Sequence, residues 1–245
     1  MIWLVLAVVA AGLARLVWGL RRGLSRQGRL TLLCRRAGLE FAAMDLFETS
    51  AWLPFPMFGR SGHGTENVVW EGRRGFDIRA FDFWYEDASD DRPVGPRRRL
   101  TCAVVPLGTS GRRLRVGPRD VDDELRSVLG LREIELELED FNRRFAVHTE
   151  DERFAISFLE QRMMEAILAL PLGVALDVNE DTVLLSGPEL PPEQVLRLFD
   201  AAVAIHERIP RSLPSLYPPR PTEGPHEDRW FQGHWSSEPI DGPGA

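Results

Sequence analysis

The segment EDFNRRFAVHTEDERFA, Glu139 to Ala155, holds the densest group of charged and aromatic side chains in the chain. Two interpretations compete for it: a catalytic or binding site, or a strand that turns into a helix. The preceding run REIELELED, Arg132 to Asp140, alternates apolar and acidic residues, which predicts a half-exposed strand. We expect NRRFAVHT, Asn142 to Thr149, to pair back against that strand.

The second half of the segment has the marks of a helix start. Thr149 followed three residues later by Glu152 predicts a capping box, and the acids between them suit the positive end of the helix dipole. From there apolar residues recur at helical spacing, which predicts a helix from about 152 to 170 with one buried stripe. The stripe comprises Phe154, Ala155, Phe158, Leu159, Arg162, Met163, Ala166, Ile167 and Leu170. The structural interpretation is therefore favoured.

Two residues of the segment need a further explanation, the adjacent Arg143 and Arg144. Side chains alternate between the two faces of a strand. On the strand predicted here, at least one of the two guanidinium groups faces the core side and needs a carboxylate partner.

The rest of the chain alternates short strands with helices. Three hairpins are predicted: VVWE with FDIRAFDFWYE around GRRG, LTCAVVPL with GTSGRRLRV, and VALDV with TVLLSG around NED. Further helices are expected over residues 118–130 and 192–209, the first beginning near Pro118 and the second stopped by Pro210. The order ββ, ββα, ββα, ββα predicts an α+β domain with a mainly antiparallel sheet and about three helices.

The N-terminus predicts a membrane-spanning helix over residues 1–21. The run from Ile2 to Ala14 carries no charge, and a helix from Ile2 to Leu20 is about 28 Å long, close to the hydrocarbon thickness. Trp3 and Trp18 lie near its two ends, where interfacial anchors are expected. Arg15 lies about one turn from one end, so that its side chain can extend to the headgroups.

A secretory signal peptide is the alternative, but it requires positive charge before the apolar run. Here the arginines follow it, beginning with Arg21 and Arg22. The positive-inside rule then predicts a single-pass protein of the cell membrane, with the N-terminus outside and the C-terminal domain in the cytoplasm.

Charge is distributed unevenly along the chain. Residues 1–36 carry seven arginines and no acid, so with a net charge of −7 for the whole chain the remainder carries −14. The basic segment Arg21 to Arg36 is predicted to lie near anionic lipid. An acidic body argues against nucleic acid as a partner.

Beyond the anchor, three further regions are predicted. A juxtamembrane helix is expected over 22–47, a cytosolic α+β domain over 48–210, and a disordered tail over 211–245, which is rich in proline and polar residues. The tail contains Trp230, Phe231 and Trp235, which is unusual for such a composition. An inert tail is the simpler interpretation, and a short linear contact is the alternative.

The sequence contains no recognisable catalytic, cofactor or metal motif. It has no lysine, which excludes phosphate loops of the GxxxxGK[ST] type and Schiff-base sites in their usual form. The five histidines lack zinc-ligand spacing, and GRSGHG, Gly59 to Gly64, fits neither a dinucleotide fingerprint nor a nucleophile elbow. Of the two cysteines, Cys34 is either acylated near the membrane or, as we favour, a buried thiol.

Two long stretches carry a family resemblance: PFPMFGRSGHGTENVVWEGRRGFDIRAFDFWYE, Pro54 to Glu86, and EDFNRRFAVHTEDERFAISFLEQRMME, Glu139 to Glu165. With the apolar N-terminus they resemble an uncharacterised family of single-pass membrane proteins of high-GC Gram-positive bacteria, over most of residues 1–210. The candidate signature residues, either binding or structural, are Phe141, Asn142, Arg143, Arg144, Phe145, Arg153 and Arg162. The resemblance implies a cytosolic domain but no activity or cofactor.

The functional expectation is a membrane-tethered interaction or scaffold module that is not an enzyme and binds a protein partner. The alternative is a small-ligand or lipid-headgroup binding domain. Its pocket would be formed by the aromatic loop Trp52 to Phe58 and by Arg143 and Arg144.

Overall fold

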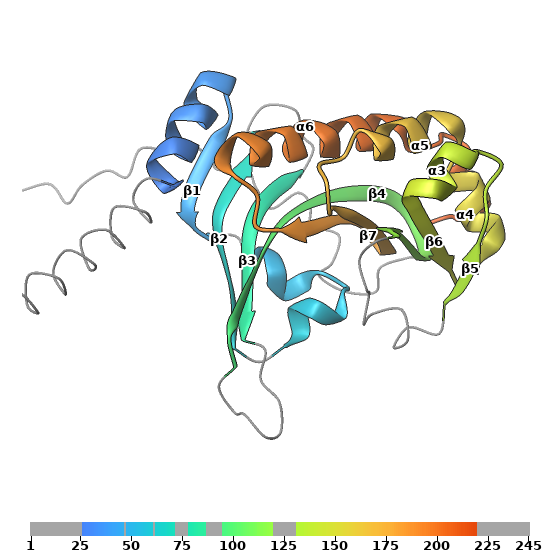
Figure 1. The fold of residues 1–245 in the computed structure, drawn as a ribbon, viewed down its shortest axis with the longest axis horizontal. Coiled ribbons are helices and arrows are strands. Elements are labelled where there is room, and N and C mark those ends of the chain that lie inside the picture. The colour runs from blue at the N-terminus through green and yellow to red at the C-terminus, as the bar shows by residue number, and fades with distance from the viewer. Residues whose placement is uncertain are drawn as a thin grey trace, which may run out of the picture.

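The chain folds as an α+β structure around one antiparallel sheet (Figure 1). The computed structural model describes residues 26–46, 48–60, 62–71, 78–86, 95–119 and 131–219. The seven strands are β1 (Glu40–Met44), β2 (His63–Trp70), β3 (Arg79–Glu86), β4 (Arg97–Pro118), β5 (Arg132–Ile134), β6 (Phe145–Thr149) and β7 (Ala175–Pro188). The predicted fold class is thus confirmed in its broad form.

Strand β4 organises the sheet. Its first half pairs with β3 and its last residues pair with β6, whereas β7 pairs with it along most of its length. The strand order is β1-β2-β3-β4-β6-β5, with β7 attached to β4 alone. Every pairing is antiparallel.

The second and third predicted hairpins are wrong, because each is one long strand. The glycines and Pro106 of β4 mark bulges instead of a turn, and the register with β7 shifts between Pro106 and Gly111 and again before Leu114. In β7, the expected NED turn contains Glu180 in the left-handed region, at φ 51°, opposite Gly111. A residue in the left-handed region produces a bulge as readily as a turn.

Helices cover one face of the sheet (Figure 1). Within the described ranges there are six: one over residues 26–37, α3 (Glu139–Arg144), α4 (Glu152–Phe158), α5 (Gln161–Leu168), α6 (Pro192–Arg208) and α7 (Leu213–Leu216). This is more than the three expected, and the ββα repetition is not found. The helix predicted over 152–170 is two helices, separated at Leu159 and Glu160.

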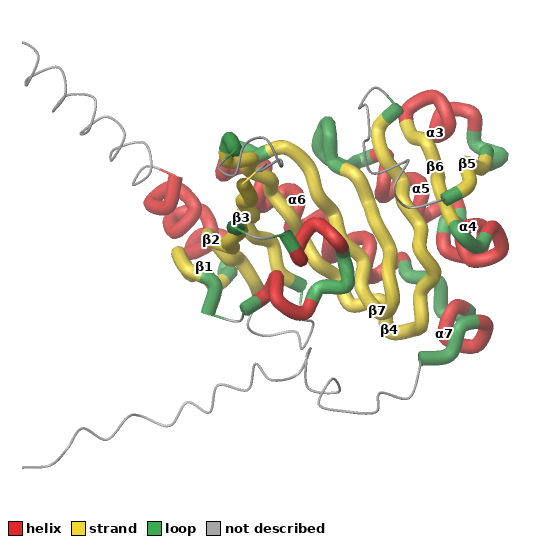
Figure 2. The backbone as a smooth tube through the Cα atoms, turned by 90° about the horizontal axis from the view of Figure 1, so that it is seen from below, coloured by secondary structure: helices red, strands yellow, loops and turns green. Residues whose placement is uncertain are grey.

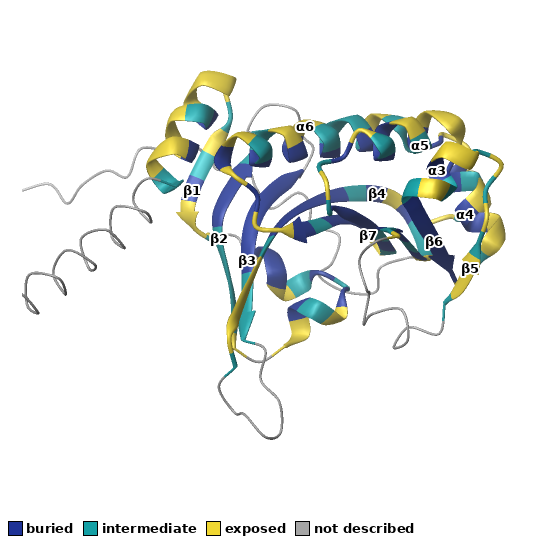
Figure 3. Cartoon of the chain, viewed as in Figure 1, coloured by how far each residue is buried: buried dark blue, intermediate teal, exposed yellow. Residues whose placement is uncertain are grey.

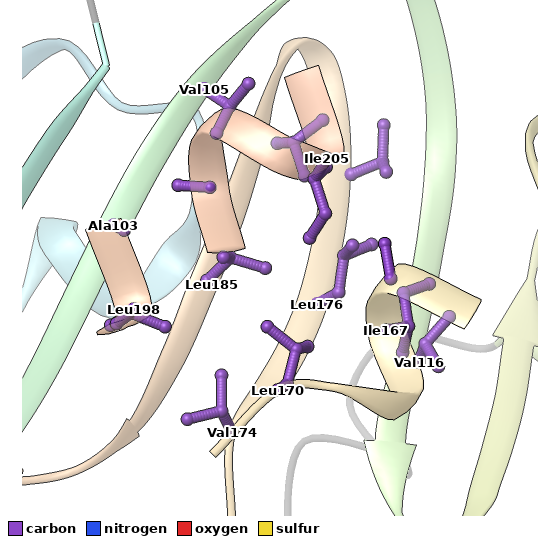
Figure 4. Close-up of a cluster of buried hydrophobic side chains, with 14 of the residues drawn as sticks. Ala103, Val105, Val116, Ile167, Leu170, Val174, Leu176, Leu185, Leu198 and Ile205 are labelled. Carbon is purple, nitrogen blue, oxygen red and sulfur yellow. The ribbon is translucent and has the colours of Figure 1, made fainter. Parts of the chain in front are cut away.

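Buried side chains form one cluster on each face of the sheet (Figure 3). The larger cluster packs α6 and α5 onto β4 and β7, through residues such as Val105, Leu185 and Ile205 (Figure 4). The smaller cluster lies under the 3-10 helices η1 (Thr49–Trp52) and η2 (Pro56–Gly59). Figure 2 shows these two short helices crossing the strands on the face opposite α6.

The predicted helix over 22–47 is shorter in the structure. It ends at Gly38, whose φ is 72°, and the Leu39 amide donates to the Cys34 carbonyl at 2.9 Å, as in a Schellman cap. The chain then reverses into β1, where the phase of Phe41 and Met44 had suggested more helix.

Both ends of the chain extend past the described residues. The predicted membrane segment 1–21 and most of the predicted helix 118–130 lie outside them, and no helix inside them is long and apolar enough to span a membrane. At the other end, α7 follows Pro210 and buries Leu213 completely. The folded body therefore includes residues 211–219, which composition had assigned to the disordered tail; residues 220–245 lie outside the described part.

Candidate functional site

The segment Glu139 to Ala155, the candidate site of the sequence analysis, forms helix α3, strand β6 and the start of helix α4. Its residues 139–144 form helix α3, and the strand begins only at Phe145, so Arg143 and Arg144 do not alternate across a sheet. Arg143 is exposed and pairs with Asp140 one turn away. The expectation of a carboxylate partner for an inward-facing arginine is therefore wrong.

Arg144 is held by backbone carbonyls at the end of another helix. Its guanidinium donates to Leu168 O at 2.6 Å and Leu170 O at 3.2 Å, just where α5 ends. These carbonyls have no partner within their own helix, and a cation suits the negative end of the dipole. Arg144 also lies 5.3 Å from the centre of the Phe145 ring. It is a structural cap for α5.

The predicted capping box is replaced by a single cap. Asp151, not Thr149, is the N-cap of α4, and its carboxylate accepts from the Phe154 amide at 3.0 Å. Thr149 Oγ1 accepts from the Asp151 amide at 3.0 Å and so shapes the turn before the helix. The apolar residues of the stripe are buried as predicted on both sides of the break after Phe158, whereas Arg162 is exposed.

The remaining signature residues are also structural or exposed. Phe141 and Phe145 are buried with ring centres 5.3 Å apart, and Asn142 Oδ1 accepts from the Leu136 amide at 3.1 Å. Arg153 is exposed. None of these residues lines either of the two hollows described below.

A hollow lies on the face of the sheet opposite α6, between the η1–η2 loop and the bulged middle of β4 and β7. We call it the loop groove; its volume is about 370 Å³. Its lining residues are Ser50, Ala51, Leu53, Pro54, Phe55, Pro56, Phe58, Gly59, Arg113 and Asn179. A smaller hollow of about 30 Å³ adjoins it and shares Phe55, Pro56, Arg113 and Asn179.

The loop holds its position because its phenylalanine side chains pack against the sheet. Phe58 packs edge-on against Phe83 of β3, with ring centres 4.7 Å apart, and Phe55 is also buried. The start of the loop is fixed by Asp45, whose carboxylate accepts from the Thr49 amide at 2.6 Å. Asn179 of β7 donates to the Pro54 carbonyl and so attaches the middle of the loop to the sheet.

The two bulges place the polar groups of the loop groove. Gly111 must be glycine, because a Cβ there would lie 2.6 Å from the Glu180 carbonyl oxygen. Two residues further along β4, Arg113 points into the groove wall, with Nε 2.9 Å from Glu150 Oε2, and its side chain remains 47% exposed. Deeper in the smaller hollow, Arg115 and Asp177 form a cross-strand ion pair at 2.6 Å, about 12% exposed.

The loop groove combines an apolar floor with a few polar groups. The floor of the loop groove is apolar, and a guanidinium and an amide stand at its rim, a typical composition for a binding site of this size. The described residues hold no group of three or more metal-ligating side chains. Trp52 packs onto the smaller core cluster instead of lining the groove, and Arg143 and Arg144 lie elsewhere. Part of the aromatic loop thus lines a hollow, but Trp52, Arg143 and Arg144 of the predicted pocket do not line it.

Sequence patterns gave little warning of Arg113 and Asn179. Both lie in segments that resemble turns, GTSGRR and NED, and only the pairing of Gly111 with Glu180 brings them together across β4 and β7.

The two cysteines and the last helical histidine have structural environments. Burial raises the pKa of the Cys34 thiol to about 11 and raises that of Cys102 further. His206 of α6 is half-buried, with Nδ1 3.2 Å from the Pro106 carbonyl oxygen.

A buried polar network joins the helix over 26–37 to the sheet. Arg26 makes two contacts with the Asp82 carboxylate of β3, at 2.7 and 3.0 Å, and donates to Leu190 O at 2.6 Å. Asp82 is 2% exposed and also accepts from Asn67 Nδ2 and Thr101 Oγ1. Arg29, one turn along, pairs with the exposed Glu193 of α6. Two arginines of the predicted lipid-facing cluster are therefore bonded to the body.

No family model matches the chain, and no curated protein matches it. Among solved structures, the chain is similar to the crystal structure of the mycobacterial trehalose monomycolate transport factor A, TtfA. The TM-score is 0.55 at 14% sequence identity, over 82% of this chain and 100% of that one. At this identity the likeness shows a shared fold alone.

Proposed function

We propose that the chain is a membrane-tethered module that binds a protein partner through its cytosolic body and catalyses no reaction. The observation that carries the proposal is the open edge of the sheet. Within the described part of the chain β1 is hydrogen-bonded to β2 alone. Its last residue, Met44, is 72% exposed, and Leu46 two residues further on is 62% exposed. An unpaired edge with apolar neighbours accepts a strand from another protein.

The position of this edge suits a partner at the membrane. β1 follows directly after the helix over 26–37, which follows the predicted membrane segment 1–21. The Arg26–Asp82 pair supports a firm joint between that helix and the sheet. The partner therefore belongs, in this proposal, to the inner face of the cell membrane.

The structural neighbour supplies an analogy for the process. That neighbour is a trehalose monomycolate transport factor. By that analogy we propose that this chain is an accessory factor in a membrane-associated transport process. Small-ligand binding has less support, because the arginines predicted for its pocket do not line the loop groove.

The test is recovery of partners from detergent extracts of cells that express the tagged full chain. Met44→Arg with Leu46→Arg places two charges beside the β1 edge, and we expect partner recovery to fall at least tenfold. Leu172→Arg is the matched control, since Leu172 is 84% exposed between α5 and β7. Equal recovery in both variants, or no partner above background with the unaltered chain, contradicts the proposal.

The predicted orientation is tested separately. A reporter fused after Ala245 should be active in the cytoplasm, because the arginines follow the apolar segment. Activity on the outside alone would reverse the topology and with it the location of the partner.

A further inference from the structure

We propose that the loop groove is a recognition site for an acidic peptide with adjacent aromatic residues, and that the chain's own residues 227–231 fill it. This segment, EDRWF, belongs to the part of the sequence after Pro219 that the structure does not describe. The proposal goes beyond partner binding at β1 and does not depend on it.

The shape and chemistry of the loop groove match such a peptide. Leu53, Phe55 and Phe58 form an apolar floor, and the groove volume of about 370 Å³ is in the range of ligand sites, about 300–1,000 Å³. Large flat side chains fill such hollows well, since each buries a large apolar area with few rotatable bonds. Trp230 and Phe231 are adjacent and of this type.

Charge complementarity favours an acidic segment. Arg113 stands at the rim and is about half exposed, so a second carboxylate can approach it beside Glu150. In the tail, Glu227 and Asp228 are separated from the aromatic pair by one residue, Arg229. Residues 220–245 as a whole carry five acids against two arginines. An acid in this position would meet the guanidinium while the rings enter the hollow.

The place where the described chain ends makes docking within one molecule feasible. The Tyr217 carbonyl accepts from the Ser110 amide at 3.3 Å, so residue 217 lies against β4 beside its bulge. Ser110 and Arg113 are three residues apart, about 10 Å along a strand. A chain of the length from Pro219 to Trp230 spans about 18 Å as a coil, which covers the distance. Such tethering raises the effective concentration to the millimolar range.

The experiment places a photoreactive benzoylphenylalanine at position 230 of the full chain in detergent micelles. Mixing isotopically heavy and light protein separates crosslinks within one molecule from crosslinks between two. We expect the main crosslink to join position 230 to residues 50–59, Arg113 or Asn179 of the same molecule. Crosslinks spread over the surface, or formed mainly between two molecules, overturn the proposal.

Two groove variants sharpen the result. Ala51→Trp, at an exposed position on the groove wall, should lower the crosslink yield at least fivefold by filling the hollow. Arg113→Glu should lower it similarly, and adding Asp228→Arg should restore it to within about twofold. Trp235→Ala is the aromatic control and should leave the yield unchanged. A yield that neither groove variant changes overturns the proposal, whereas loss of partner recovery through β1 does not affect it.

Discussion

Arg26 and Asp82 form a bidentate ion pair that is largely buried, with their side chains 17% and 3% exposed. The pair joins the first described helix to the centre of the sheet, and Asn67 and Thr101 complete the bonding of the carboxylate. An ion pair in such a setting is costly to break, because the remaining charge has lost its partner while it stays out of water.

Removing Arg26 should therefore destabilise the fold strongly. We expect Arg26→Ala to lower the free energy of unfolding by about 3–5 kcal/mol. Arg29→Ala is the matched control on the same helix, and it should change stability far less because its pair with Glu193 is exposed. Urea unfolding followed by circular dichroism measures both, and equal midpoints for the two variants would contradict the role given to Asp82.

The adjacent arginines of α3 should differ in the same way. Arg144→Ala leaves the carbonyls of Leu168 and Leu170 without their donor and should cost about 1–3 kcal/mol. Arg143→Ala removes an exposed contact within one helix and should stay within about 0.5 kcal/mol. Thermal unfolding measures the loss of stability in both variants. A larger loss for Arg143→Ala than for Arg144→Ala would mean that Arg144 does not cap α5.

Gly111 and Gly28 should respond to alanine with opposite signs. A Cβ at Gly111 would collide with the Glu180 carbonyl oxygen, so Gly111→Ala should destabilise the bulge by about 1–3 kcal/mol. Gly28 is exposed in a helix with open space around it, so Gly28→Ala should stabilise by about 0.5–1 kcal/mol. Denaturant midpoints measure both changes. An unchanged midpoint for Gly111→Ala would contradict this prediction, because it would show that β4 and β7 can move apart at the bulge at little cost.

Cys34 should be unreactive while the protein is folded. The side chain is 1% exposed, and burial holds the pKa of its thiol near 11, so almost no thiolate exists at neutral pH. Since the unfolded thiol has the lower pKa, the unfolded state loses its proton first, and stability should fall as the pH rises from about 9 towards 11. Alkylation followed by mass spectrometry tests the first point, and rapid modification of native Cys34 would revive acylation at this position.

Local patterns predicted the elements that depend on neighbouring residues. The final helix begins at Pro192 and ends before Pro210 as expected, and the first hairpin appears as the antiparallel pair β2 and β3. The buried stripe of Phe154, Phe158 and Met163 followed from helical spacing. In each case the residues that mark the element lie within a few positions of one another, so the sequence displays their period directly.

The same patterns failed where a distant strand decided the outcome. Alternation in REIELELED predicted a long strand, yet only Arg132–Ile134 pairs with β6, because the chain must turn at Leu138 to start α3. The glycines and Pro106 of β4 predicted a turn, but in the structure β7 pairs with β4 on both sides of them, so the chain continues as one bulged strand. Local composition cannot distinguish a turn from a bulge, since both require the same unusual backbone angles.

The amino-acid sequence alone determined the α+β class, the charge separation between the two ends and the apolar N-terminal segment, since each depends on composition or on short-range periodicity. Tertiary structure alone decided where a ligand could bind. The loop groove needs Phe55 from one segment, Arg113 from a second and Asn179 from a third. These residues meet only because the bulges at Gly111 and Glu180 lie opposite each other, a contact between residues about seventy positions apart in the sequence.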